Sequence, residues 1–144
     1  MSNALFSTID RCALIGMVHL QPLPGSPNFA GNTKKITQQA IQDAMALING
    51  GCDAILVENM GDLPYVKNKV ADETFAAMSI IVDKIVQLGL PTGIQVLAAA
   101  NQQALTMAYV TGAQFIRVEG FAYSHIADEG WIDACAGPLL RKRK

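Results

Sequence analysis

A histidine, two glutamates, a glutamine and an arginine stand at or near the ends of four short apolar runs in this sequence. These residues are His19, Glu58, Glu119, Gln95 and Arg117. Histidine has an ordinary pKa near neutrality, so it can serve as an acid, a base or a metal ligand. Arginine binds carboxylates and phosphates through paired hydrogen bonds, so beside glutamates it forms either an ion pair or an anion site. Whether these side chains meet depends on the elements that carry them.

The four apolar runs are predicted to be buried strands, because each is short and is bounded by glycine or proline. They lie near residues 12–19, 53–58, 92–97 and 114–119. Apolar residues at helical spacing fill the intervals between them. Strands that alternate with helices indicate a parallel sheet with right-handed crossovers.

Polar residues and glycines mark the expected ends of the helices. The expected N-caps are Asn32 or Thr33, Asp72 and Asn101. The expected stops are Gly50, Gly89 and Gly112. A last helical stretch is expected to begin after Asp128 and to end at Gly137 and Pro138, because proline removes a donor and clashes with the preceding turn.

An internal similarity favours a barrel built from repeated pieces. Residues 51–58 and 112–119 share glycine, isoleucine, valine and glutamate at matching places, two strand–helix units apart. Four such units are half of an eight-unit barrel. We therefore predict an α/β fold that is the N-terminal half of a (β/α)8 TIM barrel. Residues 1–144 would form one partial domain, with a basic tail over residues 138–144.

Strand parity predicts which side chains face the inside of this half-barrel. On the fourth strand Ile116 and Val118 would face the helices, so Arg117 would point inward. The same alternation turns five polar residues inward, and a sixth follows in the loop after the second strand. They are His19, Glu58, Gln95, Arg117, Glu119 and Asp62. Barrel enzymes carry their chemistry at these carboxyl ends of the strands.

The inward set suggests roles for its members. His19, Glu58 and Arg117 are the catalytic candidates, with His19 as acid or base and Arg117 holding a carboxylate or phosphate. Gln95, Glu119 and Asp62 are candidate substrate-binding residues. His19, Glu58 and Asp62 also carry atoms that bind divalent cations, but no metal site is assigned and the cofactor is unknown. The alternative is that the arginine–glutamate pair and the histidine serve structure alone.

Composition excludes several classes of protein. The formal net charge is −1, which argues against a nucleic-acid binder driven by phosphate attraction. The last four residues are all basic, so the rest of the chain is acidic. The three cysteines lie far apart, as expected for reduced intracellular thiols. No apolar run reaches the length of about 18 residues that spans a membrane. We expect a cytoplasmic protein, with the mitochondrion as the alternative.

Three segments resemble the motifs of a known family. Residues 15–27 (IGMVHLQPLPGSP) resemble the signature of the BtpA/SgcQ family, and residues 53–64 (DAILVENMGDLP) resemble its second motif. Residues 115–119 (FIRVE) resemble a third. The resemblance covers nearly the whole chain from about Ala13. It implies a fold similar to phosphate-binding (β/α)8 barrels, in a family whose members are usually longer than this chain.

The resemblance adds candidates but no settled reaction. The positions that match the family motifs are His19, Pro22, Pro24, Gly25, Glu58, Asn59, Asp62 and Arg117. Asn59 thereby joins the candidate substrate-binding residues. The sequence departs from the family at Ala98–Ala100, where a polar stretch is typical, so the third strand is not expected to contribute a charged side chain.

Three functions follow as alternatives. The first is an enzyme-like barrel that binds a small phosphorylated metabolite at the strand ends. The second is a non-catalytic assembly or stability factor, since one branch of the family is associated with photosystem I accumulation. The third is a truncated product without independent activity. Strand edges without neighbours predict that the chain self-associates, with a poorly packed chain as the alternative.

Overall fold

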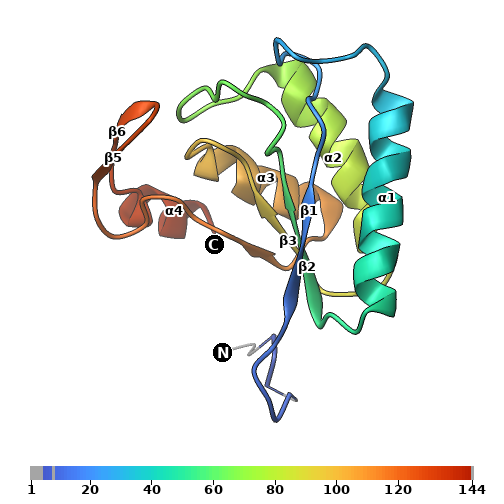
Figure 1. Cartoon of the computed structure of the whole chain (residues 1–144). Helices are drawn as coiled ribbons and strands as arrows, with labels where there is room; N and C mark the ends of the chain where they lie inside the picture. Colours follow the sequence, from blue (N-terminus) through green and yellow to red (C-terminus); the bar gives the residue numbers. More distant parts are fainter. Residues whose placement is uncertain (1–4, 8, 144) are drawn as a thin grey trace.

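The protein contains one parallel sheet, with an antiparallel hairpin beyond its last strand. The computed structural model describes residues 5–7 and 9–143. The sheet has the order β1 (Ile15–His19), β2 (Ala54–Glu58), β3 (Thr92–Gln95) and β4 (Phe115–Ile116). The helices between the strands are α1 (Thr33–Asn49), α2 (Asp72–Val86) and α3 (Asn101–Thr111). The hairpin consists of β5 (His125–Ala127) and β6 (Gly130–Ile132), and α4 (Ala136–Lys142) follows it (Figure 1).

The strand order shows how the helices are distributed. All neighbouring strands of the main sheet are parallel, and their order in space is their order in the chain. Because the crossovers between such strands are right-handed, α1, α2 and α3 lie on the same face of the sheet. Figure 1 shows these helices in succession along that face. Each new strand is added on the same side of the previous one, as in a barrel. The predicted α/β fold of βα units is confirmed.

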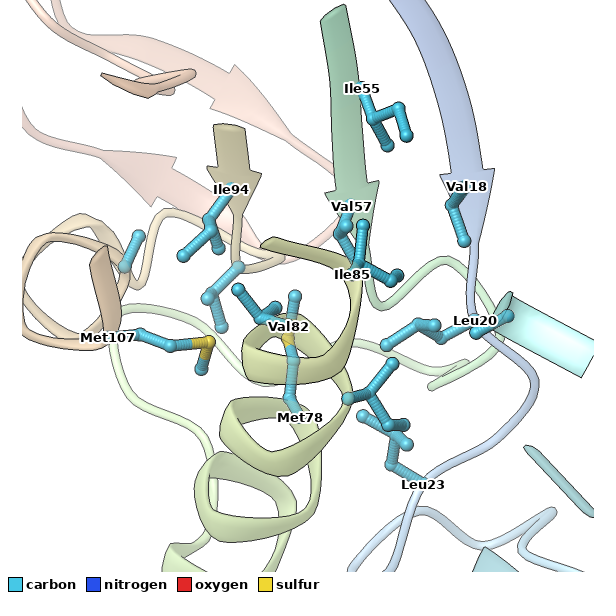
Figure 2. Packing of buried hydrophobic residues seen from close by; sticks show 14 of the residues in the cluster. Val18, Leu20, Leu23, Ile55, Val57, Met78, Val82, Ile85, Ile94 and Met107 are labelled. Carbon is cyan, nitrogen blue, oxygen red and sulfur yellow. The ribbon is translucent and has the colours of Figure 1, made fainter. Parts of the chain in front are cut away.

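The hydrophobic core lies between the sheet and its helices. Val18, Val57 and Ile94 project from the three longer strands and are fully buried. In Figure 2 they face Met78 and other apolar side chains of α2. β-Branched residues suit this position because they fill the pleated surface of a strand. The alternate residues of these strands therefore point away from the helices, as the sequence predicts.

Two of the three expected N-caps are wrong. Asn32 does cap α1, with its side chain accepting a hydrogen bond from the Lys35 N–H at 3.0 Å. Asp72 and Asn101 are instead the first residues of α2 and α3. An acidic residue in the first turn still stabilises α2 through the helix dipole. The Asn101 side chain instead hydrogen-bonds the backbone of Glu119, in the loop after β4.

The expected helix after Asp128 is also wrong, because this segment forms the β5–β6 hairpin. Asp128 lies at its turn, and Gly130 begins β6 with a φ of 97° that side chains rarely adopt. Gly137 and Pro138 lie in the first turn of α4 and do not end a helix. Proline is tolerated there because the first N–H groups of a helix have no intrahelical acceptor.

All four strands are shorter than their predicted ranges. β1 begins at Ile15 instead of residue 12, and β2 begins at Ala54 instead of residue 53. β4 pairs with β3 only at Phe115 and Ile116, and β3 ends at Gln95. Gly50 and Gly112 stand directly after α1 and α3, as expected. Gly112 has a φ of 78°, the left-handed conformation in which glycine ends a helix at low cost. Across the described residues, no helix is both long and apolar enough to cross a membrane.

Candidate functional site

Four polar side chains form a row across the carboxyl ends of the sheet. The register places His19 beside Glu58 and Glu58 beside Gln95, one residue on each of β1, β2 and β3. Arg117 directly follows β4, and its N–H donates to the Ile94 carbonyl at 2.9 Å. We call His19, Glu58, Gln95 and Arg117 the polar row. Strand register alone brings its members together, because equivalent positions on neighbouring parallel strands point to the same face.

Glu58 is the centre of the polar row. Its side chain is 1% exposed, and its Oε1 forms an ion pair with Nη2 of Arg117. Its Oε2 lies 3.4 Å from Nε2 of His19. On the other side, Nε of Arg117 donates to Oε1 of Gln95. A buried carboxylate is costly unless opposite charge or hydrogen bonds offset the loss of water, and both neighbours provide this.

The two basic members of the row also face solvent. The side chains of His19 and Arg117 are 51% and 53% exposed. The contacts of Arg117 use Nε and Nη2, and no acceptor among the described residues bonds its Nη1. The guanidinium is thus held in one orientation, and its Nη1 donors remain free to bind a ligand. Such an arrangement can bind a carboxylate or phosphate at the carboxyl ends of the strands, which we call the mouth of the half-barrel.

Asn59 and Asp62 lie in the loop after β2 and do not join the row. The Asn59 side chain is fully buried and bonds both the N–H and the carbonyl of Leu97, at 2.7 and 3.2 Å. The Asp62 carboxylate accepts from the Leu23 N–H at 2.7 Å and from Nδ2 of Asn59 at 2.9 Å. Burial raises the pKa of Asp62, and these two hydrogen bonds oppose the shift. The pair links the loops that follow β1, β2 and β3.

Glu119 also lies apart from the row. Its Oε2 accepts from the Ala99 N–H at 2.9 Å, and its Oε1 lies 3.7 Å from Nε2 of His125. Asn101 holds the backbone of Glu119 on both sides, donating to its carbonyl at 2.7 Å and accepting from its N–H at 3.2 Å. The structure therefore divides the predicted inward set into the polar row and two groups of loop contacts.

Sequence reasoning missed several residues around the mouth. Tyr65 donates from its hydroxyl to the Met60 carbonyl at 3.0 Å. Burial raises its pKa, and the carboxylates of Asp62, Glu129 and Glu58 add to the shift. Lys67 donates to the Trp131 carbonyl at 2.7 Å and so ties the hairpin to the loop after β2. The Tyr65 contact lies within one loop, whereas the Lys67 contact joins residues 64 positions apart, and nothing in the local sequence signals it.

The donor atoms at the mouth do not form a metal-binding cluster. Within the described ranges, no group of three or more histidine, cysteine, aspartate or glutamate side chains is arranged to hold a metal ion. Cys135 contacts Nδ2 of Asn101 at 3.3 Å, away from the polar row.

Solved structures share the fold. The chain is similar to the dihydropteroate synthases of Yersinia pestis and Burkholderia cenocepacia, with TM-scores of 0.52 and 0.51 and sequence identities of 20% and 19%. The matches cover 74% and 75% of this chain, and 36% and 33% of theirs. Those enzymes are TIM barrels, so the likeness supports a partial barrel and says nothing about the reaction.

Curated relatives match almost the whole chain. A Caenorhabditis elegans protein named as uncharacterized and mitochondrial is 45% identical over 93% of this chain. The photosystem I biogenesis protein BtpA of Synechocystis is 42% identical over 97%. An uncharacterized protein of Pyrococcus horikoshii is 40% identical over 90%. This chain spans about half the length of each, 50% in all three.

The family model gives the assignment. The model of the BtpA family matches residues 10–144, which include all three motifs and every member of the polar row. The predicted resemblance is confirmed, and the protein belongs to the BtpA family.

Proposed function

We propose that the polar row binds the anionic group of a small phosphorylated metabolite. Arg117 and His19 contact the ligand in this proposal, and Glu58 and Gln95 hold Arg117 in place. The observation that carries it is a half-exposed guanidinium fixed between two acceptors beside a half-exposed imidazole. A guanidinium oriented before binding loses less conformational freedom when a ligand arrives.

Two features of the fold support this location. The row stands at the carboxyl ends of parallel strands, where α/β barrels bind their ligands. The loops after β1, β2 and β3 are linked by buried hydrogen bonds of Asn59 and Asp62. Rigid surroundings of this kind keep a binding residue in its productive position. Asn59, Asp62 and Glu119 are the further substrate-binding candidates, and they would act here through the loops that they position.

A ligand screen with matched variants tests the proposal. The melting temperature of the full chain is measured with inorganic phosphate and a panel of sugar phosphates. At least one phosphorylated compound is expected to raise it for the wild type and for Lys35→Met, an exposed control on α1. The same compound is expected to give no shift for Arg117→Met combined with Glu58→Gln, which removes both charges of the pair. Absence of any shift with the wild type, or an equal shift with the double variant, contradicts the proposal.

His19 is the proposed acid or base if the site is catalytic. Its Nε2 faces Glu58 at 3.4 Å while half of the side chain is open to solvent, as a proton-transferring imidazole requires. His19→Gln is expected to keep ligand binding within about tenfold and to abolish turnover, because glutamine hydrogen-bonds but does not transfer protons near neutral pH. Turnover that survives in His19→Gln excludes this role.

The similarity to the photosystem I biogenesis protein of Synechocystis favours a second candidate, a non-catalytic assembly or stability factor. This function makes no use of a ligand at the polar row. Glu58→Gln combined with Arg117→Met would then preserve cellular function as long as the protein folds. Loss of function with an intact fold favours the ligand-binding site instead.

The length of the relatives keeps a third alternative open, a chain without independent activity. It predicts that neither the ligand screen nor cellular complementation by the 144-residue chain gives a signal. A relative of full length would give a signal in the same assays.

The proposal also covers the subcellular location of the protein and its self-association. A cytoplasmic location is proposed, with the mitochondrion as the alternative that the name of the worm relative favours. Subcellular fractionation of cells that express the chain distinguishes the two. Self-association through the sheet edges is also proposed, and its geometry is developed below.

A further inference from the structure

The main sheet ends in two edges that have no neighbouring strand among the described residues. One lies along β1, whose other side pairs with β2, and one lies along β4, whose other side pairs with β3. The backbone of a sheet edge is a template for pairing with another strand. A parallel strand added to either edge would continue the same layer.

Apolar side chains are exposed beside both edges. Leu14 and Ile15, at the start of β1, are 55% and 37% exposed. A groove of about 710 Å³ lies beside β4 between α3 and α4, and its lining includes Tyr109, Phe121 and Leu140. All three of these side chains are exposed. Apolar surface next to an open strand edge is typical of an interaction site.

We infer that the β1 edge and the β4 edge bind each other in a dimer of this chain. A twofold axis parallel to the strands places β4 of each copy beside β1 of the other. Both contacts form at once, and all strands run in one direction. Two sheets of four strands then supply the eight parallel strands that close a TIM barrel.

The lengths of the relatives identify a second copy as a fitting occupant. This chain spans half of each curated relative and about a third of each matched barrel enzyme. The surfaces exposed here are those that the rest of a barrel would cover. A second copy offers the same number of strands, in the same direction, with helices on the same outer face. It extends the self-association proposed above and is independent of the ligand at the polar row.

Dimer formation would also change the mouth. Each copy contributes one polar row, so two clusters centred on Glu58 would face each other across the carboxyl end of one closed barrel. The inner face of the sheet would lose its contact with bulk water. Side chains such as Met17 and Phe115, which are partly exposed in the single chain, would become part of a core.

Sedimentation velocity on the full chain, over a range of concentrations, provides the first measurement. The wild type is expected to be a dimer. Leu14→Glu at the β1 edge and Leu140→Glu in the groove are each expected to weaken dimerisation about tenfold or more, because each places a charge in an apolar contact. Ile80→Glu, which changes an equally exposed side chain on α2, is expected to leave the dimer intact.

Mixing the two edge variants tests the geometry. For the mixture, the groove variant is Leu140→Lys. If β4 meets β1 of the other copy, a heterodimer of Leu14→Glu and Leu140→Lys brings opposite charges together in one contact and leaves the other contact unaltered, whereas each homodimer carries an unpaired charge in both contacts. The mixture is therefore expected to associate more tightly than either variant alone. Native mass spectrometry with one variant isotopically labelled detects the heterodimer, and circular dichroism confirms that each variant is folded.

Other outcomes overturn the inference. A wild-type monomer at all concentrations shows that no second copy covers these edges. A dimer that one variant disrupts and the other leaves unchanged indicates pairing of like edges, β1 with β1 or β4 with β4. A mixture no tighter than the separate variants excludes the reciprocal arrangement. Ligand binding by the polar row is measured separately, so its failure is distinguishable from any of these results.

Discussion

Glu58 shows how one buried side chain organises its neighbours. The fold places its carboxylate at the end of β2 with 1% exposure, between a guanidinium and an imidazole that both reach solvent. The net stability from such a pair is small, because desolvation of the carboxylate offsets the attraction. Removal of one partner costs more, because the remaining group stays buried without its counter-charge.

This asymmetry predicts non-additive effects on stability. Arg117→Met is expected to lower the free energy of unfolding by about 1–3 kcal/mol, because it leaves Oε1 of Glu58 unpaired. Glu58→Gln in the Arg117→Met background is expected to recover part of that loss. Urea unfolding of both variants measures the two values, with Lys35→Met as the exposed control. Equal or additive losses would show that the two side chains are not energetically coupled.

Asp53 gives a prediction about acid stability. Its carboxylate accepts from the Leu14 N–H at 2.7 Å and forms two 2.8 Å bonds with the Arg11 guanidinium. The backbone hydrogen bond and then the Arg11 contact lower its pKa below the ordinary 3.8. Because the folded pKa is the lower one, this stabilisation is fully present above 3.8 and is lost as the pH falls through the folded value.

Asp53→Asn should therefore be less stable than the wild type at neutral pH, and the difference should shrink in acid. The free energy of unfolding in urea, measured from about pH 7 to about pH 3, tests this. A difference that stays constant over the whole range would show that the Asp53 charge contributes nothing.

At the scale of elements, close contact between the loops after β1 and β2 supports the mouth. Gly61 hydrogen-bonds the Leu20 carbonyl through its N–H at 3.0 Å. A Cβ at Gly61 would lie 2.6 Å from the Pro22 nitrogen and 2.7 Å from the Leu20 oxygen. These neighbours are backbone atoms, which cannot rotate away as a flexible side chain can. Glycine is needed here for the approach of two chain segments.

Gly61→Ala is accordingly expected to destabilise the protein by about 1–3 kcal/mol. Gly50→Ala is the control, because a Cβ there meets nothing closer than 3.3 Å. Thermal and urea unfolding compare the two variants. If both have the same stability, the loop contact is not as tight as the structure indicates.

At the scale of the whole molecule, the described residues form a parallel layer covered by helices on one face, with the β5–β6 hairpin and α4 beyond β4, and none of them pairs with the outer edge of β1 or β4. The exposed apolar groove beside β4 should bind a dye such as anilinonaphthalene sulfonate. If a second copy covers the groove, dye fluorescence per chain should fall as protein concentration rises. Leu140→Glu should remove this concentration dependence and Ile80→Glu should retain it. Fluorescence per chain that stays constant for the wild type indicates that the groove remains open in solution.

Local patterns were enough to predict the main architecture. Short apolar runs bounded by glycine, with amphipathic segments between them, predicted the four parallel strands and the three helices that cover them. Strand alternation predicted that Arg117 and Glu58 share a face, because side-chain direction follows directly from the two-residue period. The same period predicted that His19 and Gln95 point to this face, and the register places them beside Glu58.

The segment after β4 was predicted least well. Asp128, Gly137 and Pro138 are residues that begin or end several kinds of element, so their types alone did not distinguish a hairpin turn from a helix end. The hairpin is tied to the loop after β2 by the hydrogen bond between Lys67 and Trp131, residues that are 64 positions apart.

The sequence by itself determined the family, the βα alternation and the side of the sheet on which each strand residue lies. These properties depend on short-range periodicity and on motifs within single segments. Only the tertiary structure decided that Asn59, Asp62 and Glu119 bond loop backbone while His19, Glu58, Gln95 and Arg117 form one row. That division depends on how far each residue lies beyond the end of its strand and on which loop packs against it. Such distances arise from packing between remote segments, and no local pattern encodes them.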